Sequence, residues 1–164
     1  MELILTVMAD DRPGIAERLA RAVEQHQGNW LESRMATMAG KFAGIVRIEL
    51  PDSQFDAAHQ ALTGLAAEGL MVQLERGHQV TSEATEHRLE VVGNDRPGIV
   101  REVTNVLANL GVNVIDLQTE IEPASMSGGS LFRAKIEFSL TASQNMTGVI
   151  SALEALSPDL MVDL

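Results

Sequence analysis

The sequence predicts an α+β fold made of two ferredoxin-like βαββαβ domains in tandem, paired side by side. The first observation is an internal repeat, since the segment Asp-Arg-Pro-Gly-Ile at residues 11–15 recurs at residues 95–99. The second is that strand-like and helix-like apolar spacings follow in the same order in both copies. The third is the length of 164 residues, which is enough for two small domains.

Each copy is predicted to open with a strand followed by a helix. Leu3, Leu5 and Val7 alternate as residues on one side of a strand do, and so do Leu89 and Val91. The helix has apolar residues at i, i+4, i+7 and i+8, which are Ile15, Leu19, Ala22 and Val23 in copy one and Ile99, Val103, Val106 and Leu107 in copy two.

The rest of each copy is predicted to contain a hairpin, a second helix and a closing strand. Alternation is clearest in the hairpin of copy two, at Phe132, Ala134, Ile136, Phe138 and Leu140. The second helix has its apolar stripe at Phe55, Ala58, Leu62 and Leu65, and again at Met146, Val149, Leu153 and Leu156. Copy two has four extra residues in its hairpin loop, within residues 125–130.

This order of elements gives a four-stranded antiparallel sheet with both helices on one face, because the crossovers are right-handed. The predicted domains are residues 1–77 and 87–164, joined by a polar linker at residues 78–86. One sheet face and the sheet edges of so small a unit stay uncovered, so we expect the two copies to pair within the chain. A homodimer is the alternative.

Composition argues against several classes of function. The chain is 45% hydrophobic and 21% charged, which predicts a packed core. Its net charge of -11 repels phosphates and anionic lipids, so neither nucleic acid nor a membrane is expected as a direct partner. The absence of cysteine excludes disulfides and thiol chemistry. With no long apolar run and no signal-peptide pattern, we expect a cytoplasmic protein.

Neither a metal site nor catalysis is predicted. The histidines are not spaced as metal ligands, and Asp10 and Asp11 are not followed by further carboxylates at loop spacing. The sequence has no Gly-x-Ser-x-Gly motif and no nucleophile placed beside a helper group. We therefore expect a protein that is not an enzyme and needs no cofactor.

The repeated loop is the first candidate for a ligand site. Pro13 suits a first helical turn, and Asp11 ahead of it could cap free backbone N–H groups. Gly14 leaves room for a ligand to approach the main chain, and a helix N-terminus attracts a carboxylate. Alternatively, the loop is only a helix start.

The asparagine that opens the second strand is the other candidate. Asn29 and Asn113 each stand 18 residues after the aspartate of the repeated loop. The helix between the aspartate and the asparagine is expected to bring the chain back near that loop. The amide could then bind a carboxylate while Asp11 or Asp95 pairs with an ammonium group. Alternatively, each asparagine only turns the chain at a helix end.

These residues carry a resemblance to a known family. Two copies of strand, Asp-Arg-Pro-Gly-Ile, helix, Gly-(x)-Asn, hairpin, helix and strand resemble tandem ACT domains, and the two-domain layout is similar to the glycine cleavage system transcriptional repressor group. The resemblance implies sensing of a small molecule, usually an amino acid, between paired ACT domains. The ligand contacts that it implies are Asp11, Pro13, Gly14, Ile15, Asn29, Asp95, Pro97, Gly98, Ile99 and Asn113.

The resemblance also implies how such a protein acts. Repressors of this group resemble switches that lack a DNA-binding domain and act through a protein partner, here a DNA-binding transcriptional activator. The alternatives are a ligand-independent structural adaptor and a detached regulatory subunit of an amino-acid biosynthetic enzyme. Many amino-acid-sensing ACT domains have asparagine in the first loop, whereas this chain has Asp11 and Asp95, which lack the amide donor.

Overall fold

The computed structural model describes residues 1–78, 83–125 and 128–164. The chain divides into two compact units, Met1–Val80 (unit 1) and Thr81–Leu164 (unit 2). Unit 1 contains β1 (Glu2–Asp10), α1 (Ile15–Gln25), β2 (Asn29–Met38), β3 (Lys41–Glu49), the 3-10 helix η1 (Asp52–Gln54), α2 (Phe55–Thr63), the 3-10 helix η2 (Gly64–Glu68) and β4 (Met71–Arg76). Unit 2 contains β5 (Thr85–Asn94), α3 (Ile99–Asn109), β6 (Asn113–Pro123), β7 (Ser130–Leu140), α4 (Met146–Glu154) and β8 (Met161–Asp163).

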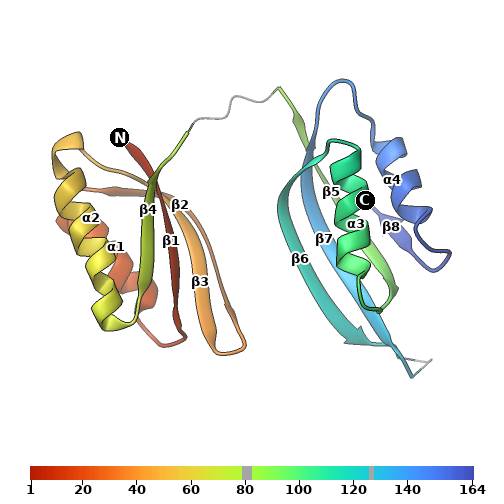
Figure 1. The fold of residues 1–164 in the computed structure, drawn as a ribbon, viewed down its shortest axis with the longest axis horizontal. Helices are drawn as coiled ribbons and strands as arrows, with labels where there is room; N and C mark the ends of the chain where they lie inside the picture. The colour runs from red at the N-terminus through yellow and green to blue at the C-terminus, as the bar shows by residue number, and fades with distance from the viewer. Residues whose placement is uncertain (79–82, 126–127) are drawn as a thin grey trace. The chain divides into compact units, whose positions relative to one another are not determined.

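The described residues of each unit form a four-stranded antiparallel sheet, with strand order β2–β3–β1–β4 in unit 1 and β6–β7–β5–β8 in unit 2. Two helices accompany each sheet (Figure 1), which confirms the α+β class and the βαββαβ order. The side-by-side pairing and the domain limits 1–77 and 87–164 stay predictions. Within the predicted linker 78–86, residues 79–82 lie outside the described residues, and β5 begins at Thr85.

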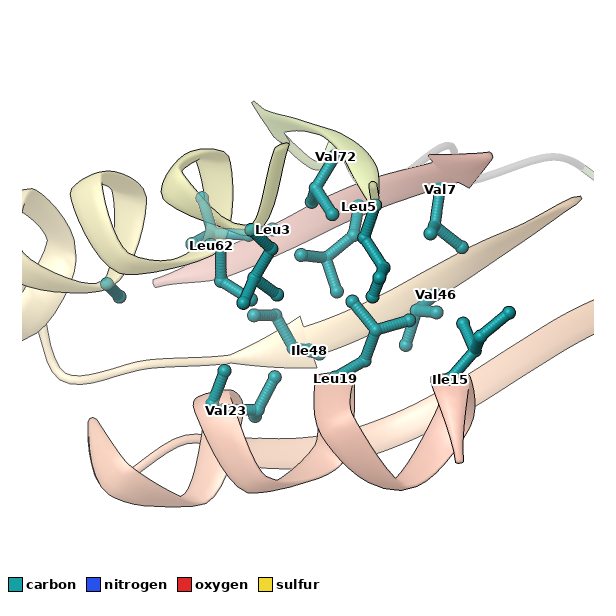
Figure 2. Packing of buried hydrophobic residues seen from close by; sticks show 14 of the residues in the cluster. Leu3, Leu5, Val7, Ile15, Leu19, Val23, Val46, Ile48, Leu62 and Val72 are labelled. Atoms are coloured by element: carbon teal, nitrogen blue, oxygen red, sulfur yellow. The ribbon is translucent and has the colours of Figure 1, made fainter. Parts of the chain in front are cut away.

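The core of unit 1 lies between its sheet and its helices. The four α1 residues of the predicted stripe are all buried, and so are alternate residues of β1. Figure 2 shows Leu19 and Val23 of α1 pointing towards Ile48 of β3. Burial at both spacings confirms the two periodic patterns, because a helix or strand that covers a core must present one apolar side to it.

The core of unit 2 is built in the same way around β7. Its five alternating apolar residues, Phe132 to Leu140, are all buried. The stripe of α3 is buried except at Val106, and α4 buries Val149 and Leu153. Met146 at the start of α4 is half-buried, and so is Leu156, which the prediction placed in this helix but which lies two residues beyond its end. No helix within the described ranges is both long and apolar enough to span a membrane.

The two hairpins differ in their connections. In unit 1, Ala39 and Gly40 join β2 to β3 with φ angles of 48° and 78°, the pair of positive angles found in a tight two-residue turn. In unit 2, β6 ends at Pro123 and β7 begins at Ser130, so the four extra residues lengthen this loop. Residues 126–127 of the predicted insertion lie outside the described part of the chain.

Candidate functional site

The loop between β1 and α1 ends in a left-handed glycine. Gly14 is the N-cap of α1 with φ of 89°, and its carbonyl accepts the N–H of Arg18 at 2.9 Å. The predicted capping by Asp11 and the placement of Pro13 in the first helical turn are therefore wrong, because both residues precede the cap. An L side chain is strained at this φ, so glycine is the residue that lets the helix begin here.

The loop between β5 and α3 has the same backbone geometry. Gly98 caps α3 with φ of 90°, and its carbonyl accepts the N–H of Glu102 at 3.0 Å. Asp95 and Pro97 are exposed ahead of it, whereas Ile99 is buried. A Cβ atom built on Gly14 or on Gly98 would meet no described atom within 4 Å. The space over both glycines is therefore open to a ligand.

The predicted approach of each asparagine to its own loop is wrong. Along β3, Lys41 pairs with Asp10 and Glu49 pairs with Asn29, so eight residues, or about 26 Å, separate the two positions. Because α1 runs back along the sheet, β2 starts at the end where β1 starts. Asp11 and Asn29 thus lie at opposite ends of one sheet.

Unit 2 repeats this separation. On β7, Leu131 pairs with Asn94 and Ser139 pairs with Asn113, again eight residues apart. Each asparagine is exposed at the first position of its strand. The left-handed residues that turn the chain after each first helix are Gln27 and Gly111, so the alternative in which the asparagine itself makes the left-handed turn is also wrong.

A pocket of about 380 Å³ lies beside the β5–α3 loop of unit 2. It is lined by the loop residues Asp95, Arg96 and Gly98, by Ile99 and Val100 of α3, by Thr119, Glu120 and Ile121 of β6, and by Phe132 of β7. Three of the five residues predicted for this copy, namely Asp95, Gly98 and Ile99, are thus brought together. Pro97 and Asn113 are not among the residues that line it.

The pocket combines charged groups with apolar walls. Phe132 is buried, whereas Ile121 and Val100 are 54% and 41% exposed. Asp95 and Arg96 supply opposite charges from adjacent positions of the loop. Small-molecule sites usually combine mostly apolar walls with a few polar groups that fix the orientation of the ligand, and their volumes start near 300 Å³. The pocket therefore offers a small ligand apolar walls together with the charged side chains of Asp95, Arg96 and Glu120.

Arg96 is held in place by α3. Its guanidinium donates to both carboxylate oxygens of Glu102, at 2.8 and 2.6 Å. These hydrogen bonds raise the pKa of Arg96 and lower the pKa of Glu102. Arg96 therefore stays charged at the pocket, with part of its charge offset by Glu102.

The equivalent arginine of unit 1 is held differently. Arg12 donates to the carbonyl of Glu68 at 2.6 Å, and Arg18 donates to both carboxylate oxygens of Glu68 at 2.8 and 2.7 Å. These bonds tie the first loop and α1 to the residues ahead of β4. The hydrogen bonds from Arg18 are the main cause of the lowered pKa of the Glu68 carboxyl.

Replacing Arg18 by glutamine should raise the pKa of Glu68 towards its ordinary value, measured by carboxyl ¹³C NMR against pH. A lowered carboxyl pKa stabilises the fold above the ordinary value of 4.5, and this contribution is lost as the pH falls through the lowered pKa. Arg21→Gln, which breaks the separate pair with Glu17, is the control and should leave the pKa of Glu68 unchanged. An unchanged Glu68 pKa in Arg18→Gln would contradict this account.

Six residues that line the pocket were not predicted as site residues, namely Arg96, Val100, the three β6 residues 119–121 and Phe132. The contribution of β6 depends on strand register, which joins positions that are far apart in the chain. Among the residues that the structure describes, no group of three or more His, Cys, Asp or Glu side chains could hold a metal ion.

Comparison with known proteins shows which protein family the chain belongs to. Family models of the ACT domain match residues 2–75 and 81–158. The chain therefore belongs to the ACT domain family and carries two ACT domains in tandem.

Two of the solved structures that match the chain over almost its whole length share its fold. An unknown protein from Galdieria sulphuraria is 31% identical with a TM-score of 0.85, and the match covers 99% of this chain and 95% of that one. A protein named "putative glycine cleavage system transcriptional repressor" is 20% identical with a TM-score of 0.70, at the same coverage, and this likeness shows the shared fold. A search of curated proteins gave no match.

Proposed function

We propose that this chain is a regulatory protein that senses an amino acid and acts through a protein partner. The observation that carries the proposal is the pocket beside the β5–α3 loop, in a chain composed of two ACT domains. The loop offers an exposed carboxylate at Asp95, a guanidinium at Arg96 and a helix N-terminus. An amino acid has the complementary ammonium and carboxylate groups.

The contacts proposed first are those of the unit 2 loop, which lines the pocket, and the unit 1 loop and the two asparagines are the further candidates. In unit 2, Asp95 would accept a hydrogen bond from the ammonium group, while Gly98 leaves the first turn of α3 open to the carboxylate. Asn29 and Asn113 lie far from the loops of their own units. Either asparagine can share a small ligand with a loop only if the two come from different units or from different copies of the chain.

The proposed partner is a DNA-binding transcriptional activator. The proposal draws on the fold shared with the protein named as a repressor, and on the net charge of -11, which opposes direct binding to DNA. In this role the protein is cytoplasmic, has no catalytic activity and shifts between partner-bound and free states with the level of its ligand.

A ligand-independent adaptor is the second candidate. Its support is a set of apolar side chains on one face of the unit 1 sheet, where Met8 pairs with Met71 and Ile45 pairs with Thr6. Met8 and Met71 are both more than half exposed, and clustered exposed apolar side chains often mark a protein interface. An adaptor should keep its partners whether or not amino acids are present.

Thermal unfolding with each of the twenty amino acids tests sensing. A ligand that binds only the folded protein should stabilise it by about 2.7 kcal/mol at 100 times its Kd. Acetate and methylamine, each with one of the two charges, are the controls and should give no shift. The proposal fails if no amino acid raises the melting temperature or gives heat in calorimetry. Partner capture with and without the binding amino acid then separates the sensor from the adaptor.

A further inference from the structure

We infer that only unit 2 holds the ligand, one molecule per chain, and that this ligand is an amino acid with an apolar side chain. The inference rests on the proposed function and adds to it the number of sites and the class of side chain. It follows from a comparison of the two units at the surface beside their first helices.

The strand register identifies the equivalent positions. In unit 2, Thr119 of β6 pairs with Ala134 of β7, and in unit 1, Met35 of β2 pairs with Gly44 of β3. Each pair lies beside the equivalent valine of the first strand. Met35 therefore stands where the pocket of unit 2 has Thr119.

Met35 occupies the corresponding space in unit 1. A Cβ atom built on Gly44 would lie 2.6 Å from Cγ of Met35, so the methionine side chain covers the glycine. Met35 is half-buried and packs against the hydrophobic core of unit 1. Threonine has a much shorter side chain, and Thr119 lines the pocket instead of filling it.

The apolar walls of the pocket are also specific to unit 2. Ile121 pairs with Phe132, and the equivalent pair in unit 1 is Thr37 with Phe42. Val100 in the first turn of α3 is matched by Ala16 in α1. Unit 1 thus lacks the two large exposed apolar side chains that flank the pocket in unit 2.

These walls define the class of ligand. An apolar group that covers the exposed isoleucine and valine side chains removes apolar surface from water, which favours binding. Glycine has no side chain to place there, whereas leucine, isoleucine, valine, methionine and phenylalanine do. We therefore expect these five to bind more tightly than glycine, by about 10-fold or more for the best of them.

Calorimetry with each of these five amino acids and with glycine tests the inference on the full chain. The wild type should bind one molecule per chain. Thr119→Met, which puts the residue of unit 1 into unit 2, should weaken binding by about 10-fold or more. The reciprocal variant Met35→Thr is the matched control and should change the affinity by less than about 2-fold. A second variant, Ile121→Thr, also copies unit 1, and we expect about a 10-fold loss in affinity.

The outcomes are separable. Two molecules per chain, a preference for glycine, or a loss of affinity in Met35→Thr but not in Thr119→Met would each overturn the inference while leaving amino-acid sensing intact. No binding of any of the twenty amino acids to the wild type would overturn the proposed function itself. If circular dichroism shows Thr119→Met to be unfolded, the affinity of Ile121→Thr tests the inference instead. Unchanged affinity in Ile121→Thr would contradict the inference.

Discussion

Replacing Phe138 by alanine should lower the free energy of unfolding by about 3–5 kcal/mol. Phe138 is fully buried in β7, within the core of unit 2. The substitution removes the whole ring and leaves a cavity that the neighbouring side chains fill only in part. Urea unfolding followed by circular dichroism measures the change.

Phe55→Ala is the matched control for Phe138→Ala. Phe55 is only half-buried at the start of α2, against the core of unit 1, and lies below Arg76 with the guanidinium carbon 5.8 Å from the ring centre. Truncation to alanine should therefore lower the free energy of unfolding much less at Phe55, because less ring surface returns to water. Equal losses at the two positions would contradict the burial described for Phe138.

Gly28→Ala should destabilise the protein by about 1–3 kcal/mol. A Cβ atom at Gly28 would lie 2.5 Å from Cδ2 of Leu50 and 2.7 Å from Cγ1 of Val23. It would also lie 2.8 Å from the backbone carbonyl oxygen of Val23, which cannot move without disturbing the end of α1. The crowding, and not the backbone angle, is what requires glycine here.

Gly64→Ala makes the same chemical change without crowding. Gly64 has φ of -64°, and a Cβ atom there would meet no described atom within 4 Å. Alanine should therefore stabilise the protein by about 0.4–1 kcal/mol, because it restricts the unfolded chain. Opposite signs for Gly28→Ala and Gly64→Ala are the expected result of chemical denaturation, and destabilisation by both would contradict the packing described here.

The fold was predictable because buried apolar residues recur along the chain at regular spacings. Residues such as Leu19 and Val23 fall at helix spacing, and Ile136 and Phe138 fall at strand spacing, so each local pattern already shows which side faces the core. The repeat strengthened the prediction, since two independent sets of residues indicated the same order of elements.

The site was less predictable because it depends on how distant segments align. The sequence indicated Asp95 and Gly98, but Thr119 and Ile121 reach the same pocket only through the register of β6 on β7. The expected approach of Asn113 to the loop failed for a different reason. A strand-helix-strand crossover returns the chain to the end of the sheet where the first strand starts, so the predicted order of elements already separates Asn113 from the loop.

The two copies keep one backbone and differ in side-chain chemistry. The left-handed glycines have φ angles within one degree of each other, whereas Arg12 bonds to Glu68 and Arg96 bonds to Glu102. Duplication of a ligand-binding fold allows one copy to keep the site while the other specialises in structure or partner contact. The hydrogen bonds of Arg12 and Arg18 to Glu68 in unit 1, and the pocket in unit 2, agree with such a division of roles between the copies.

The most direct test of the central claim is an amino-acid titration followed by ¹H–¹⁵N NMR. An apolar amino acid such as leucine should shift the backbone amides of residues 98–100 and 119–121, which surround the pocket of unit 2. The amides of residues 14–16 and 35–37, their counterparts in unit 1, should move much less. Shifts centred on those unit 1 residues, or no shifts with any amino acid, would contradict ligand binding in unit 2.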